Sequence, residues 1–141
     1  MPQLPQNSQL ENYKNQLKSD KMTEKLFRQK KFDESLCEAI DETLTSMGEP
    51  LKNTVYFNLE NYFNIPRGEI PKHIDEFTDF LYKTFGLGAA LFEIRCMKKL
   101  HSKIDVNIQM GNGEWSSPNW ITEGMTFRKY VWCARNNYCN P

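Results

Sequence analysis

Glycines and prolines divide the middle of this sequence into segments whose apolar residues recur at helical spacing. Gly48, the Glu49-Pro50 pair and Gly86-Leu87-Gly88 mark the divisions, because glycine readily ends a helix and proline is accommodated in a first turn. Between them, apolar side chains three or four residues apart give each segment one buried face. The pattern predicts helices over residues 33–47, 51–63, 74–85 and 87–104.

Before residue 33, apolar residues recur from Leu10 to Phe27 among charged ones, which predicts a solvent-rich amphipathic helix. Residues 11–31 carry charges of both signs, with a break expected at Ser19-Asp20, and Asp33 is predicted to be the N-cap of the next helix. Residues 1–10 contain two prolines and three glutamines without an apolar period, so we expect a flexible lead-in there. Residues 64–71 are expected to form an extended, turning connection, pinned to the core by Ile65 and Ile70.

The period of the pattern changes after residue 104. Apolar residues alternate with polar ones up to the turn sequence Gly111-Asn112-Gly113, namely Ile104, Val106, Ile108 and Met110. Alternation followed by such a turn indicates a strand, and Met125–Cys133 favours another. We therefore expect residues 105–141 to be an aromatic-rich C-terminal extension that forms a β-hairpin.

These segments together predict a mainly α fold. We expect a compact helical bundle of four to five helices over residues 11–104, with a short β-like C-terminal extension. The chain has 141 residues, 39% of them apolar, which is enough for one core without metal or disulfide support. Phe57, Phe77 and Leu91 are expected to touch inside it.

Charge and cysteine usage narrow the function classes. Eighteen basic and eighteen acidic residues give zero net charge, so there is no overall attraction to nucleic acid or anionic lipid. No run approaches the roughly 18 apolar residues of a membrane span, and the N-terminus lacks a signal-peptide pattern, so we expect no membrane partner and a cytoplasmic location. The four cysteines form no CxxC pair, and His73 and His101 lack ligand spacing. We expect reduced thiols, no metal and no cofactor.

Catalytic patterns are also missing from the sequence. It contains no GxxxxGK[ST], HExxH or GxSxG motif. Cys96 and His101 are five residues apart and do not share one helical face, which disfavours a cysteine–histidine nucleophile. We expect a protein that is not an enzyme.

Residues from about 35 to 104 contain a set of short runs in a fixed order. The runs are Leu44-Thr45-Ser46-Met47-Gly48-Glu49, Val55-Tyr56-Phe57-Asn58-Leu59-Glu60, Ile65, Glu69-Ile70-Pro71, Phe77 and Phe85-Gly86-Leu87-Gly88-Ala89-Ala90. In order and spacing they resemble an archaeal module, the Nitrosopumilus output domain, in the variant numbered five. The resemblance implies an all-helical module of signal output or regulation and supplies no catalytic or ligand residues.

Three surfaces are candidate binding sites. The helix at 33–47 has an acidic outer face, and the helix at 87–104 gathers basic residues whose charge complements it. The sequence leaves open whether these two faces meet within one chain or between chains. Trp115 and Trp120 flank a loop, and exposed tryptophan is enriched among the residues that contribute most to protein binding. The residues are Glu38, Asp41 and Glu42 for the acidic face, Arg95, Lys98, Lys99 and Lys103 for the basic face, and Trp115 and Trp120.

Two functions follow from these surfaces. The leading hypothesis is a regulatory interaction module that binds a protein partner, including another copy of itself. The alternative is a nucleic-acid-binding transcriptional regulator that uses the basic face of the last helix, with Lys30 and Lys31, on phosphates. The eight-residue link at 64–71 is too long for a helix-turn-helix motif, which disfavours the alternative.

Overall fold

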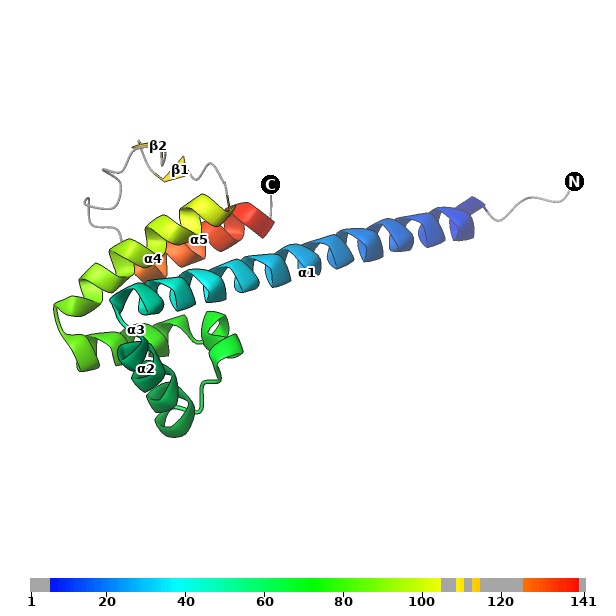
Figure 1. The fold of residues 1–141 in the computed structure, drawn as a ribbon. Coiled ribbons are helices and arrows are strands. Elements are labelled where there is room, and N and C mark those ends of the chain that lie inside the picture. The colour runs from blue at the N-terminus through cyan, green and yellow to red at the C-terminus, as the bar shows by residue number, and fades with distance from the viewer. Residues whose placement is uncertain (1–5, 105–108, 111–112, 115–125, 140–141) are drawn as a thin grey trace, which may run out of the picture.

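The structure, a computed structural model, describes residues 6–104, 109–110, 113–114 and 126–139. In chain order the elements are α1 (Gln6–Met47), α2 (Glu49–Tyr62), the 3-10 helix η1 (Arg67–Lys72), α3 (Ile74–Phe85), α4 (Gly88–Ile104), β1 (Gln109–Met110), β2 (Gly113–Glu114) and α5 (Phe127–Cys139). Figure 1 shows α1 crossing the molecule, with α4 and α5 on one side of it and α2 and α3 on the other. The prediction of a mainly helical bundle is confirmed.

Two glycines end helices where the sequence predicts. Gly48 has φ 125° and Gly86 has φ 55°, values that favour glycine because it has no Cβ atom. The Gly48 N–H donates to the carbonyl of Thr45 and the Gly86 N–H donates to that of Tyr82. Each turn lets the next helix fold back onto the core.

Helix α1 is one continuous element, which corrects three expectations. It begins at Gln6, inside the expected lead-in at 1–10, and it passes through Ser19-Asp20 without a break. Asp33 lies inside the helix and is not an N-cap. Its carboxylate accepts a hydrogen bond of 2.9 Å from Arg135 of α5, a partner 102 residues away in the chain.

The core is formed by one face of every helix. Rings of Phe77, Phe92 and Phe127 lie 5.9–6.5 Å apart at its centre. The expected contact among Phe57, Phe77 and Leu91 is wrong, because the Phe57 and Leu91 side chains are exposed. Helix α2 turns another stripe inward, made of Val55, Tyr56 and Leu59.

Helix α5 corrects the strand predicted over Met125–Cys133. Its buried side chains recur at helical spacing and pack against α1, α3 and α4, so the core extends past residue 104. They are Phe127, Tyr130, Val131 and Ala134. Between α4 and α5, the two-residue strands β1 and β2 pair antiparallel, with Gln109 opposite Glu114. The rest of the predicted hairpin region lies outside the described residues.

The connection between α2 and α3 is only partly extended. Pro66 has extended backbone, but residues 67–72 form η1 instead of continuing the loop. Ile65 and Ile70 are buried, as the sequence predicts.

Candidate functional site

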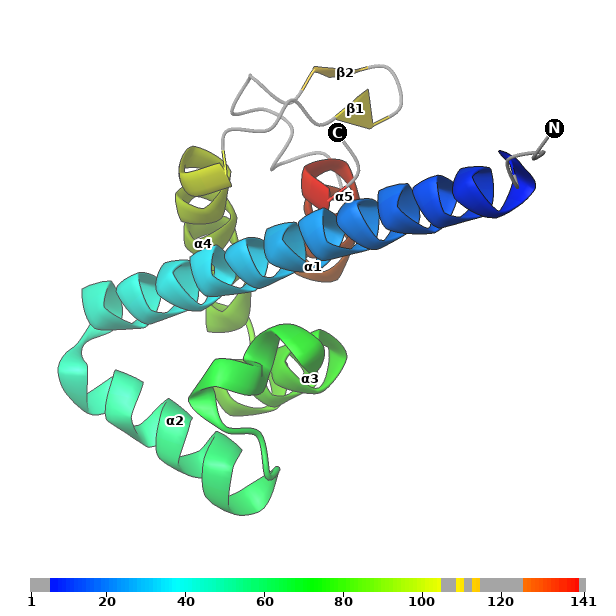
Figure 2. The ribbon, with the colours of Figure 1, turned by 90° about the vertical axis from the view of Figure 1, so that its right-hand side faces the viewer.

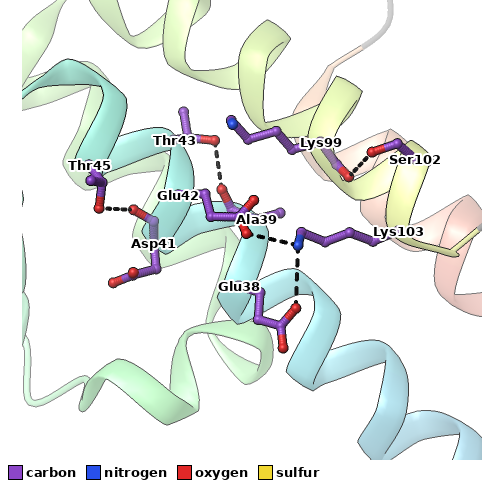
Figure 3. A network of polar contacts seen from close by, with 9 residues as sticks. All are labelled: Glu38, Ala39, Asp41, Glu42, Thr43, Thr45, Lys99, Ser102 and Lys103. Atoms are coloured by element: carbon purple, nitrogen blue, oxygen red, sulfur yellow. Dashed lines mark hydrogen bonds and ion pairs between the residues drawn. The ribbon is translucent and has the colours of Figure 1, made fainter.

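The predicted acidic and basic faces meet within one chain. The ammonium group of Lys103, near the end of α4, donates to Glu42 at 3.0 Å and to Glu38 at 3.3 Å on α1. Figure 3 shows the lysine reaching across from α4 to both carboxylates. The hydrogen bond with Glu42 is the main cause that raises the pKa of Lys103. These three residues therefore hold two helices of the bundle together.

Asp41, the third residue of the acidic face, is also paired inside the molecule. Its carboxylate accepts a hydrogen bond of 3.0 Å from the Tyr56 hydroxyl and lies 3.5 Å from the ammonium of Lys52. Burial, and next the hydrogen bond to Asp41, raises the pKa of Tyr56. The guanidinium of Arg67 stacks over the Tyr56 ring at 3.9 Å. The acidic face is therefore largely neutralised by the chain's own cations.

The rest of the basic face on α4 is divided. Arg95 and Lys98 are exposed, whereas Lys99 is half-buried. Neither the Arg95 nor the Lys98 side chain forms an ion pair within the part of the chain that the structure describes. Trp115 and Trp120 lie outside the described residues.

The first part of α1 is a surface that sequence reasoning missed. We call residues 10–27 the arm: every side chain in it is exposed, and Figure 2 shows it extending beyond the bundle as a single helix. From Phe32 onward the same helix is buried against α2, α4 and α5. A helix with solvent on all sides is free to approach a partner.

A line of cations runs along the arm and ends at the half-buried Arg28, one residue beyond it. Lys14, Lys18, Lys21, Lys25 and Arg28 follow one another at intervals of four and three residues, so they lie on one face of the helix. We call these five residues the cationic ridge. The ridge continues, beyond the bundle, the stripe that Phe32 and Leu36 bury inside it. Where the core ends, apolar side chains on this face give way to basic ones.

The ridge is only slightly compensated by acidic groups. Arg28 bonds Glu24 at 2.8 Å, but the four lysines make no hydrogen bond or ion pair within the described residues. Within the arm, residues 10–27, four basic side chains stand beside three acidic ones, and Arg28, Lys30 and Lys31 bring the net charge of residues 10–31 to +4. Because the whole chain is neutral, the remainder has a net charge of −4. The zero total therefore conceals two regions of opposite sign.

The exposed apolar side chains of the arm do not form one face. At about 100° per residue, Leu10, Tyr13 and Leu17 lie on one flank of the ridge, and Met22 and Leu26 lie on the other. The ridge itself contains no apolar side chain. Its chemistry is that of repeated ammonium groups facing water.

Two clefts on the bundle are lined entirely by residues that the structure describes. One, of about 470 Å³, lies beside the acidic face and includes Cys37 and Arg67 in its lining. Burial, followed by the nearby carboxylates, raises the pKa of the Cys37 thiol to about 11, so it stays protonated at neutral pH and is a poor nucleophile. The other, of about 280 Å³, is bordered by Trp132 and by His73, which lies 3.3 Å from Glu76.

Cys96 and His101 differ in burial, since His101 is only half-buried. Cys96 is fully buried, and burial raises the pKa of its thiol. The Nδ1 atom of His101 lies 3.3 Å from the hydroxyl of Tyr130 on α5. This geometry gives His101 a packing partner in the core.

Further searches of the structure and of known proteins gave three findings. Among the described residues, no group of three or more His, Cys, Asp or Glu side chains is arranged to hold a metal ion. No helix in the described ranges has the length and hydropathy needed to cross a membrane. The comparisons found no family model, no curated protein and no solved structure that matches the chain.

Proposed function

We propose that this chain is a regulatory module that acts by binding and not by catalysis, and that the arm of α1 is its binding element. One observation carries the proposal: the arm projects as an exposed helix, and the four lysines of its ridge form no ion pair with the described residues. The resemblance of residues 35–104 to an archaeal output domain supports a signalling role, and we assign the module to the cytoplasm. Its ligand is an anionic macromolecule.

The charges on the ridge are unfavourable for the free helix. Lys14–Lys18 and Lys21–Lys25 are like charges four residues apart, and such pairs destabilise a helix by about 0.2–0.5 kcal/mol each. The arm gains little burial in return, since its side chains are exposed. An anionic partner would remove this repulsion and add ion pairs, which supports recognition as the role of the ridge.

Retention on immobilised heparin, a general polyanion, tests the proposal. We expect the wild type to be retained at low salt and a Lys14→Gln, Lys18→Gln, Lys21→Gln triple variant to elute much earlier. Glutamine keeps the helix propensity of lysine, so the arm stays helical.

A matched control removes the same charge from exposed positions elsewhere. Lys72→Gln, Lys83→Gln and Lys129→Gln lie on η1, α3 and α5 and should leave retention nearly unchanged. A Lys98→Gln, Lys99→Gln variant tests the basic face of α4 in the same way. Equal loss of retention in the arm and control variants, or no retention of the wild type, would contradict the proposal.

The apolar flank of the arm supports a second candidate, a protein partner. Leu10, Tyr13 and Leu17 are exposed at the spacing of a coiled-coil seam. A partner helix, from another protein or a second copy, would cover them. Sedimentation of wild type and of a Leu10→Gln, Leu17→Gln variant at rising concentration tests self-association: an unchanged monomer in both would contradict the homo-oligomer.

A further inference from the structure

The cationic ridge is long enough to contact several phosphates of a DNA duplex. From Lys14 to Arg28 the helix rises about 21 Å, at about 1.5 Å per residue. Over that length of duplex axis each strand presents roughly six phosphates, which wind around the axis at one per about 3.4 Å. The phosphates of the two strands along this length therefore outnumber the five cations of the ridge.

We infer that the arm binds double-stranded DNA through its phosphates, without reading the bases. The inference rests on the proposed function, because it names the anionic macromolecule that the arm recognises. Binding adds ion pairs at the ridge while the bundle, with its net charge of −4, stays away from the duplex.

The isolation of the arm makes this contact sterically possible. An α-helix with its side chains is about 10–12 Å across, and the major groove of B-DNA is about 12 Å wide. Continuous helices that project from a folded body are a known docking geometry on DNA. Since all side chains of residues 10–27 are exposed, no part of the bundle that the structure describes covers the arm.

The composition of the ridge disfavours the other anionic partners. A helix that lies on an anionic membrane needs a single apolar face, but Leu17 and Met22 lie on opposite flanks of the ridge. Single-stranded nucleic acid is held by aromatic side chains that stack on bases, but the two exposed aromatic residues of the arm, Tyr13 and Phe27, lie off the ridge at about 100° per residue. The major groove of duplex RNA is too deep and narrow for a helix. Pairing of two arms through their ridges would bring the five positive charges of one ridge against the five of the other.

The absence of base recognition also follows from the residue types in the ridge. Four of its five members are lysines, which act as point charges on phosphates, whereas base edges are read most often by bidentate arginine, asparagine or glutamine. The ion pair of Arg28 with Glu24 is exposed on the helix surface, so a phosphate can replace the carboxylate. Affinity should therefore depend steeply on salt and weakly on DNA sequence.

Fluorescence anisotropy with a labelled 25-base-pair duplex tests the inference on the full chain. Five phosphate contacts predict that log K falls with log salt at a slope of about −4.5, since each contact contributes about −0.9. The Lys14→Gln, Lys18→Gln, Lys21→Gln variant should reduce the slope to about −1.8. At 0.1 M salt it should weaken binding by roughly 500-fold, about eightfold for each lost contact. The Lys72→Gln, Lys83→Gln, Lys129→Gln variant should keep the wild-type slope.

A charge-conserving variant separates a lost contact from a damaged arm. Lys14→Arg, Lys18→Arg, Lys21→Arg retains three cations that donate to phosphate and should bind as the wild type does. All variants should have the wild-type melting temperature, because the substituted side chains are exposed.

Competing ligands complete the test. Retention on heparin without binding to the duplex would overturn this inference and leave the proposed function standing, whereas loss of both would overturn both. Tighter binding to single-stranded DNA, duplex RNA or vesicles rich in phosphatidylserine than to duplex DNA would also overturn it. Two duplexes of unrelated sequence should bind equally, and a tenfold preference for one would contradict binding through phosphates alone.

Discussion

Removing the Phe127 ring should lower the free energy of unfolding substantially, because α5 contributes to the centre of the core. Phe127 is fully buried, and its ring lies 6.4 Å from that of Phe77 and 6.5 Å from that of Phe92. Truncating a buried phenylalanine to alanine costs about 3–5 kcal/mol through lost burial and the cavity that remains. For a chain of this size, each kcal/mol lowers the melting temperature by roughly 3 °C. Phe127→Ala should therefore melt roughly 10–15 °C below the wild type.

A control on the same helix makes the test specific to packing. Trp132 also lies on α5 but is 69% exposed, so Trp132→Ala should change the free energy of unfolding by no more than about 0.5 kcal/mol. Urea and thermal denaturation, followed by circular dichroism, measure both variants. Equal and small effects would show that residues 126–139 do not belong to the core. They would favour the separate extension after residue 104 that the sequence predicts.

Two further predictions concern single sites. Gly48→Ala should lower the free energy of unfolding by about 1–3 kcal/mol in urea titrations, because φ at Gly48 is 125° and alanine is strained there. The strain comes from the backbone, since no described atom lies closer than 4.0 Å to the added Cβ. An unchanged midpoint would show that the turn adopts another conformation. Burial raises the pKa of the Glu93 carboxyl, and the 3.2 Å hydrogen bond from the Tyr82 hydroxyl opposes that shift. The folded state therefore binds the carboxyl proton of Glu93 more tightly than the unfolded state does, and the protein loses stability as pH rises through the folded pKa. Glu93→Gln should therefore raise the melting temperature at pH 7.5 and have little effect at pH 4, and a stabilisation that grew at low pH would refute the assignment.

The sequence was sufficient to locate α2, α3 and α4. Gly48 and Gly86 adopt positive φ values at the helix ends, and the apolar periods between them mark helices that the structure contains. These signals are local, so one sequence is enough to find them. Which side of a helix faces the core depends on its neighbours, and for this reason Phe57 and Leu91 were misplaced.

The misjudged elements depend on partners far away in the chain. Aspartate is a common N-cap residue, but Asp33 lies inside α1, where its carboxylate accepts a hydrogen bond from Arg135. Tyr130 to Trp132 have high strand propensity, yet the core selects a helix there. A helical signal was present, since the buried residues Phe127, Tyr130, Val131 and Ala134 follow helical spacing.

The candidate sites divide in a similar way. Lys103 was recognised as part of a charged surface, but only the fold reveals that Glu38 and Glu42 occupy it. The spacing of its five residues in the sequence indicates the cationic ridge, but the net charge of the whole chain, which is zero, does not. That residues 10–27 stand clear of the bundle depends on the length of α1 and on where the core ends, neither of which a local pattern specifies.

Binding through the ridge requires the arm to stand clear of the bundle in solution. Small-angle X-ray scattering measures this directly, since the 42 residues of α1 form a rod of about 63 Å. We expect a maximum dimension of at least that length, and a radius of gyration well above the roughly 14 Å of a compact chain of 141 residues. A monomer with a radius of gyration near 14 Å would show that the arm is folded back onto the bundle, and would contradict its role as an exposed binding element.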